Sequence, residues 1–159
     1  MRRRGVWCVP VLVVGLAAAV AGEAACVAIA EHPEGRTLAR IAVSERGFTI
    51  SYLHSVTRTP VDERYRVRGA EIVQEAIAFS EHGPGLPTVA DADGRFEQRD
   101  GRMTMTMQRR MPSMVMRVHA DQAPRLVANE RALDLAAWGN RSLAVTPVAG
   151  ACAGVSTND

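Results

Sequence analysis

The sequence predicts one all-β domain, folded as a single antiparallel β-sandwich or a partly open barrel of about eight to ten short strands. Three observations lead to this prediction. Apolar residues recur at every second position in short runs, which is the period of a strand with one buried face. Gly, Pro and Asp-Gly turn signals separate these runs. The length of 159 residues fits one domain, and no stretch shows a sustained helical period.

The first half of the domain reads as five strands joined by short turns. A His-Pro-Glu-Gly turn at 32–35 separates the first two strands. The third and fourth runs alternate most clearly, and one face of the fourth carries Asp62, Arg64, Arg66 and Arg68, which predicts a solvated face. The predicted strands are 26–30, 38–43, 48–55, 61–68 and 72–79.

The second half begins after a loop at 82–87 that contains two Gly and two Pro and is therefore expected to be rigid. Two Asp-Gly turns then flank a short strand near Phe96, and Met alternates with Thr along 103–107. Residues 133–138 also fit one helical turn. The remaining predicted strands are 114–120, 126–128, 132–135 and 143–148.

The charge balance argues against a nucleic-acid partner. The chain has 19 basic residues, all of them Arg, against 17 acidic residues, which gives a formal net charge of +2. Three of the arginines lie at positions 2–4, so the rest of the chain is near neutral. Nucleic-acid binding needs a concentrated basic surface. The chain also lacks a GxGxxG, Walker or HExxH motif, and we expect no cofactor and no bound metal.

The N-terminus predicts export. Residues 2–4 are positive, residues 5–20 carry no charge, and Ala19-Val20-Ala21 fits a signal-peptidase site. We therefore divide the chain into a signal peptide at 1–21, an all-β domain at 22–150 and a flexible tail at 151–159. An uncleaved leader would instead form an N-terminal helix that anchors the protein to the membrane through residues 5–21. Either case predicts the bacterial periplasm or the outer face of the cytoplasmic membrane.

Export changes how the three cysteines are interpreted. Cys8 lies inside the leader, which leaves Cys26 and Cys152 at opposite ends of the domain. In an oxidising compartment these two thiols have the opportunity to pair. The alternative is two small buried or frayed thiols, and the sequence does not distinguish the two.

The strands on either side of Pro60 are expected to pair as a hairpin. Matching their apolar faces places Ile50 opposite Val67, Tyr52 opposite Tyr65, and His54 opposite Glu63. An imidazole and a carboxylate would then lie together on the core face. In the next predicted strand, Glu75 is a second charged residue among apolar residues of the same face. Either the three line a polar pocket closed by the loops at 55–60 and 83–87, or Glu63 fastens the hairpin by accepting hydrogen bonds from loop amides and the Thr59 hydroxyl.

Two blocks of residues in this region carry a resemblance. The block Tyr-x-His-Ser-Val-x-x-Thr-Pro-Val-x-Glu-x-Tyr and the later Gly-x-Gly-Leu-Pro resemble the small exported family called domain of unknown function 1850 (DUF1850) over roughly 26–148. The resemblance implies that the protein is associated with tripartite (TRAP) transporters of the TAXI type. Its signature falls on Tyr52, His54, Ser55, Thr59, Pro60, Glu63, Tyr65, Gly83, Gly85, Leu86 and Pro87.

The function expected from these observations is a non-enzymatic, exported accessory module, with a TRAP permease or a TAXI substrate-binding protein as its partner. One alternative is a periplasmic protein that binds a small ligand or a metal at the face of His54, Glu63 and Glu75. A second alternative is a hydrolase of unfamiliar type. No residue is assigned a catalytic role.

Overall fold

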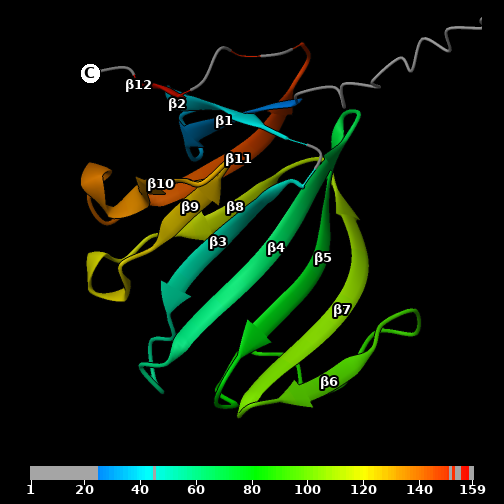
Figure 1. Ribbon diagram of the computed structural model, residues 1–159. Coiled ribbons are helices and arrows are strands. Elements are labelled where there is room, and N and C mark those ends of the chain that lie inside the picture. The colour runs from blue at the N-terminus through cyan, green and yellow to red at the C-terminus, as the bar shows by residue number, and fades with distance from the viewer. Residues whose placement is uncertain (1–24, 45, 151, 153–154, 158–159) are drawn as a thin grey trace, which may run out of the picture.

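The computed structural model describes residues 25–44, 46–150, 152 and 155–157, and over these residues the protein is all-β, as predicted. Two antiparallel sheets of five and seven strands pack against each other (Figure 1). The predicted leader at 1–21 lies outside the described residues. No helix within the described ranges is long and apolar enough to cross a membrane.

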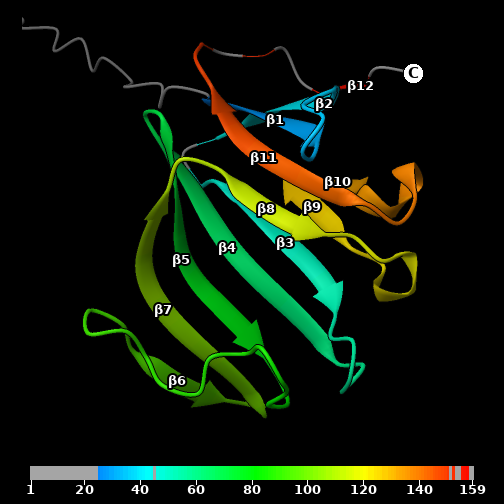
Figure 2. The same cartoon turned by 180° about the vertical axis from the view of Figure 1, so that it is seen from behind.

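The smaller sheet has the strand order β12-β2-β1-β11-β8, and Figure 2 shows it in front of the larger sheet. This sheet brings the two ends of the described chain together, because β1 and β2 near the N-terminus lie beside β11 near the C-terminus. Its strands are β1 (Ala25–Glu31), β2 (Thr37–Val43), β8 (Met114–Arg117), β11 (Ser142–Val148) and β12 (Val155–Thr157). Thus three residues of the tail expected to be flexible pair with β2.

The larger sheet has the strand order β10-β9-β3-β4-β5-β7-β6. Its strands are β3 (Phe48–Leu53), β4 (Pro60–Arg68), β5 (Glu71–Phe79), β6 (Phe96–Arg99), β7 (Arg102–Met111), β9 (Arg125–Ala128) and β10 (Arg131–Asp134). Two short 3₁₀ turns, η1 (Ala120–Gln122) and η2 (Leu135–Trp138), flank β9 and β10. The second is the helical turn expected near 133–138.

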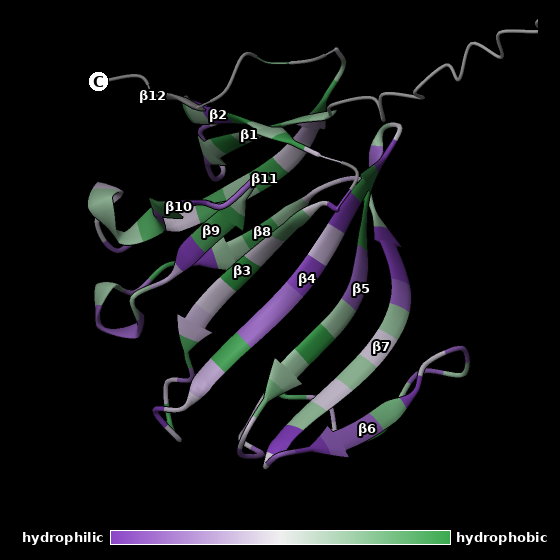
Figure 3. Cartoon of the chain, viewed as in Figure 1, coloured by the Kyte–Doolittle hydropathy of each residue, from purple (hydrophilic) through white to green (hydrophobic). Residues whose placement is uncertain are grey.

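The core has two parts. The larger part lies between the two sheets and includes Ile29, Val43, Ile50 and Leu143, all almost fully buried. The smaller part lies on the inner face of β4, β5 and β7 and is completed by a residue of the 83–87 loop; its members are Val61, Ile77, Phe79, Leu86, Met103, Met105 and Met107. In Figure 3 green and pale bands alternate along β7. The Met–Thr alternation of β7 therefore serves the core.

A disulfide bond joins Cys26 on β1 to Cys152, with 5.4 Å between their Cα atoms. Of the two possibilities that the sequence allowed, pairing is the one present in the structure. The bond closes a loop of sequence separation 126 and ties the start of the first strand to the tail that follows β11.

The predicted register of the β3–β4 hairpin was wrong. Ile50 lies opposite Glu63 and not Val67, and Tyr52 lies opposite Val61 and not Tyr65. The last pair is Leu53 with Pro60, so His54 lies beyond the strand, in the turn. The physical reason is the turn itself, because backbone hydrogen bonds close the chain directly after Leu53.

Candidate functional site

The turn between β3 and β4 is closed by its own backbone. The His54 amide donates to the Thr59 carbonyl (2.9 Å), and the Arg58 amide donates to the His54 carbonyl (3.0 Å). Arg58 takes a positive φ of 58°, which lets the chain reverse within these six residues. The Thr57 and Thr59 hydroxyls also bond to each other at 2.8 Å. The turn is therefore a defined structure before anything binds to it.

The His54 side chain fills the inside of this turn and is only 5% exposed. Its Nδ1 accepts the backbone amides of Val56 (3.3 Å) and Thr57 (3.2 Å). Because Nδ1 is an acceptor, the ring proton is on Nε2, which donates to the Pro84 carbonyl at 3.1 Å. One imidazole thus fixes its own turn and joins it to the 83–87 loop.

The 83–87 loop approaches the imidazole at Gly83. A Cβ built on Gly83 would lie 2.4 Å from Cε1 of His54, closer than real contacts allow. The loop then closes with a hydrogen bond from the Leu86 amide to the Gly83 carbonyl (3.1 Å), and Gly85 takes a φ of +89°. The buried Leu86 side chain packs into the smaller core. Glycine is needed at 83 for close approach and at 85 for conformation.

Two further ion pairs hold these loops in place. Arg58 in the turn pairs with Asp121 of η1 (3.3 Å), and its other guanidinium nitrogen donates to the Asp121 carbonyl (2.6 Å). Downstream of Pro87, Asp91 accepts two hydrogen bonds from Arg109 of β7, each 2.7 Å. Those bonds hold the pKa of the Asp91 carboxyl below its usual range.

Glu63 contacts neither His54 nor the loop amides. Its carboxylate accepts hydrogen bonds from the phenols of Tyr52 (2.9 Å) and Tyr65, one on each oxygen. Register explains why it points inward, because Glu63 lies between Ile50 of β3 and Ile77 of β5 on the core face. The Tyr65 ring stacks on Phe48 at 5.2 Å between centroids. The predicted donors to Glu63 were therefore wrong: the Thr59 hydroxyl bonds to Thr57, and two strand phenols take the place of the loop groups.

The two phenols are held strongly in their neutral form. Burial, together with the neighbouring Glu63 charge, raises the pKa of both Tyr52 and Tyr65 far above the usual value. A phenolate beside this carboxylate would place two negative charges in a partly buried setting. The cluster therefore acts as a pair of donors to Glu63.

Glu75 does not belong to the inner face, contrary to the prediction. The register of β5 shifts between Gln74 and Ala76, and Glu75 has no partner directly opposite on either neighbouring strand. This irregularity breaks the alternation on which the prediction depended. The Glu75 carboxylate instead receives two hydrogen bonds from Arg66 of β4, at 2.8 and 3.2 Å.

The predicted polar pocket of His54, Glu63 and Glu75 therefore does not form, because each is engaged in a separate set of contacts. Neither ring nitrogen of His54 is free to act as a base or ligand in this arrangement. Among the described residues, no group of three His, Cys, Asp or Glu is placed to hold a metal ion. The signature residues instead form two defined loops, the β3–β4 turn and the 83–87 loop, which the His54 ring joins.

Two participants in this arrangement were not predicted. Pro84 acts through its carbonyl oxygen, which a sequence pattern does not reveal, and Arg58 acts through its left-handed backbone and its contact with Asp121. The turn presents Val56, 65% exposed, at its tip, and the segment after Pro87 presents Val89, 77% exposed.

The comparisons with known proteins find one family. A family model described as "Domain of unknown function (DUF1850)" matches residues 48–135, from the first residue of β3 to the first residue of η2. The match contains the whole hairpin, the 83–87 loop and the strands between them. No curated protein and no solved structure gives a significant match.

Proposed function

This chain belongs to the DUF1850 family, and we propose that it is an exported, non-enzymatic accessory module of a TAXI-type TRAP solute transporter. The observation that supports this proposal is the pair of pre-organised loops joined by His54, one of which presents the exposed Val56. The contact surface would consist of the outward residues of the turn and of the 83–87 loop, with Val56 at its centre.

Rigidity matters to this proposal because ordering a loop on binding costs free energy. Each mobile side chain or segment that becomes fixed in a complex reduces the affinity. Here the turn is already closed by its backbone, by the His54 ring and by the pair of Arg58 with Asp121. A partner therefore gains from Val56 and neighbouring groups without ordering the backbone that carries them.

The position of the loops bears on which transporter component they meet. Figure 1 shows the start of β1 near the top of the molecule, whereas the β3–β4 turn and the end of β5 lie at the bottom. An anchor preceding β1 would leave the loops at the end of the domain far from the membrane. That arrangement favours the TAXI substrate-binding protein over the permease as the direct contact.

The alternative functions receive less support from the geometry. A ligand or metal site at His54, Glu63 and Glu75 requires side chains that converge, and these three do not. A hydrolase of unfamiliar type requires a base with an unoccupied position near a nucleophile. The His54 ring and the Glu63 carboxylate already have hydrogen-bond partners at each ring nitrogen and each oxygen.

The proposal is tested by affinity capture of the full-length tagged protein from solubilised native membranes, with partners identified by mass spectrometry. Three baits are compared: the wild type, Val56→Glu at the tip of the turn, and Val115→Glu on β8, whose side chain is 50% exposed on the other sheet. The wild type and Val115→Glu are expected to enrich a TRAP component, and Val56→Glu to lose it. Equal capture by all three, or capture of no transporter component by the wild type, contradicts the proposal.

A further inference from the structure

The short C-terminal strand β12 covers the outer edge of the five-stranded sheet. It is the outermost strand of that sheet and lies beside β2 (Figure 1). The pairing extends over three residues, with Val155 opposite Ile41, Ser156 opposite Arg40 and Thr157 opposite Ala39. So short a pairing adds little stability by itself. The position of β12 therefore depends on how the strand is tethered to the rest of the domain.

The disulfide between Cys26 and Cys152 provides this tether. Cys26 of β1 lies directly opposite Val148, the last residue of β11, and opposite Ala42 of β2 on its other side. The bond thus attaches the chain to β1, between β11, where it leaves the sheet, and β2, beside which it returns. Without the bond, the whole stretch 149–154 would connect β11 to β12. A longer connection lowers the effective concentration of β12 at its partner.

The backbone groups that β12 covers belong to Arg40. The carbonyl of Ala42 is directed away from β1, because it accepts a hydrogen bond from Nδ2 of Asn129 in the β9–β10 turn (2.8 Å). Backbone groups of residues two positions apart in a strand point to the same side. The amide and the carbonyl of Arg40 therefore also face this edge, where Ser156 lies opposite.

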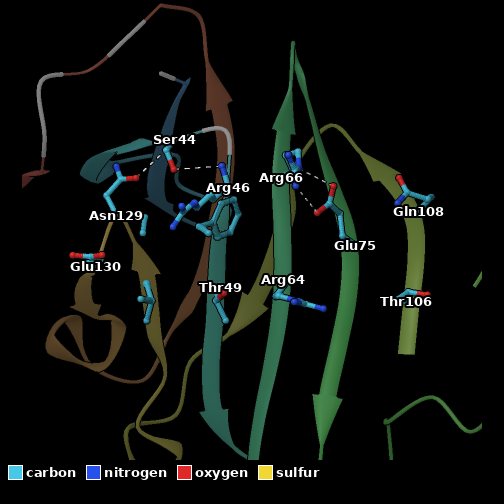
Figure 4. A pocket seen from close by; sticks show the side chains of 14 residues that line it. Ser44, Arg46, Thr49, Arg64, Arg66, Glu75, Thr106, Gln108, Asn129 and Glu130 are labelled. Carbon is cyan, nitrogen blue, oxygen red and sulfur yellow. Dashed lines mark hydrogen bonds and ion pairs between the residues drawn. The ribbon is translucent and has the colours of Figure 1, made fainter. Parts of the chain in front are cut away.

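The next part of the same edge is covered independently of the disulfide. Oδ1 of Asn129 accepts the Ser44 amide at 3.2 Å, while its Nδ2 binds the Ala42 carbonyl. Figure 4 shows the Asn129 side chain directed at Ser44. The edge of β2 thus has two covers: β12, which the disulfide tethers, and Asn129, which belongs to the other sheet.

The disulfide is accessible to a reductant from the Cys152 side. Cys26 is only 1% exposed, whereas Cys152 is partly exposed. A thiolate of a dithiol reductant attacks the Cys152 sulfur, forms a mixed disulfide with it and expels the Cys26 thiolate, which takes up a proton. The second thiol of the reductant then attacks the mixed disulfide and frees Cys152 as a thiol. The protein disulfide gains two electrons, and the reductant becomes a disulfide.

We propose that this arrangement is a redox-sensitive device, in which the intact Cys26–Cys152 bond keeps β12 on the edge of β2 and reduction by a dithiol releases it. In the released state the Arg40 backbone groups are uncovered, while the contacts of Asn129 persist. An uncovered edge is the part of a sheet that accepts an added strand. The reduced protein therefore gains a surface that β12 occupies in the oxidised protein. The proposal does not depend on the transporter association.

The test is amide hydrogen exchange of the full-length protein, followed residue by residue by NMR, with and without dithiothreitol. Reduction is expected to speed exchange of the Arg40 amide at least about tenfold, within the range that loss of a cross-link gives. The Ser44 amide is expected to keep its rate, because its acceptor is Asn129. Cys26→Ser/Cys152→Ser should show the fast Arg40 exchange both with and without the reductant.

Asn129→Gly is the matched control for the other cover of the same edge. Glycine tolerates the positive φ of 49° at this position, and the variant keeps the disulfide. Exchange is expected to quicken at Ser44 and to stay slow at Arg40. The amide of Ile29, a buried residue of β1, shows whether the whole domain opens. Equal Arg40 exchange in oxidised and reduced protein, or equal acceleration at Arg40 and Ile29, would overturn the proposal.

Discussion

Gly83 packs directly against the imidazole of His54. A Cβ at position 83 would lie 2.4 Å from Cε1 and 2.9 Å from Nε2 of that ring. The same ring donates from Nε2 to the carbonyl of the next residue, Pro84, at 3.1 Å. The missing side chain at 83 and the hydrogen bond at 84 are parts of one contact, and this contact joins the two loops of the family signature.

Gly83→Ala is expected to lower the free energy of unfolding by about 1–3 kcal/mol, because the added methyl group must displace either the ring or the loop. Urea denaturation followed by circular dichroism measures the change. In a His54→Ala background the same substitution should cost much less, since the ring that it meets is gone. Equal costs in the two backgrounds would show that the contact with His54 is not the cause.

His54→Ala is expected to lower the free energy of unfolding by about 2–4 kcal/mol, since it removes buried contacts and leaves two amides without their acceptor. Amide hydrogen exchange should quicken most at Val56 and Thr57, which donate to Nδ1. Ser55→Ala is the control, because Ser55 is exposed in the same turn. Unchanged protection at both amides in His54→Ala would contradict the role given to the ring.

The two tyrosines of the chain, Tyr52 and Tyr65, are expected to stay protonated in the native protein at pH 11. Burial and the Glu63 charge raise the pKa of both groups above the value of about 10 that they have in an unfolded chain. Their contribution to stability is therefore complete below pH 10 and is lost as the pH rises above it. Phenolate absorbance at alkaline pH should appear only on unfolding, and a reversible rise near pH 10 in the folded protein would refute this.

Glu63→Gln separates the two causes of this shift. The substitution removes the negative charge but leaves the burial, which is the larger cause for both phenols. The pKa of both phenols should therefore be lower than in the wild type but should remain above the value of the unfolded chain. An identical titration in both proteins would mean that the carboxylate contributes nothing.

Removal of the disulfide is expected to cost about 2–5 kcal/mol of stability. The bond between Cys26 and Cys152 spans a sequence separation of 126, and long closed loops restrict the unfolded chain most in the chain-entropy model. A reducing agent should lower the urea midpoint of the wild type and leave that of Cys26→Ser/Cys152→Ser unchanged. If reduction lowers both midpoints alike, the bond is not the source of the effect.

Alternation along the strands was enough to predict most of the fold. Strands β3, β4 and β7 carry clear apolar–polar patterns, and their inward residues are the predicted ones, with Ile50, Val61 and Met105 buried. Partner residues were harder to predict. The true hairpin register differs from the predicted one by an even number of residues, so the faces were right while every pair was displaced.

The positions of Glu75 and His54 could not be predicted from the alternation of apolar and polar residues. Glu75 was placed on the wrong face because a register irregularity inserts one residue at that point of β5. His54 was expected to face a carboxylate, whereas its partners are backbone groups of its own turn and of Pro84. Backbone partners have no residue type, so no pattern of side chains identifies them.

The most direct test of the account places a photo-activated crosslinker at position 56 of the full-length protein in its native cells, with position 115 as the control. Both side chains are exposed, but only Val56 lies on the loops that His54 joins. The account predicts a crosslink from position 56 to the TAXI substrate-binding protein or the TRAP permease and none from position 115. No transporter crosslink at position 56, or equal crosslinks at both positions, would contradict it.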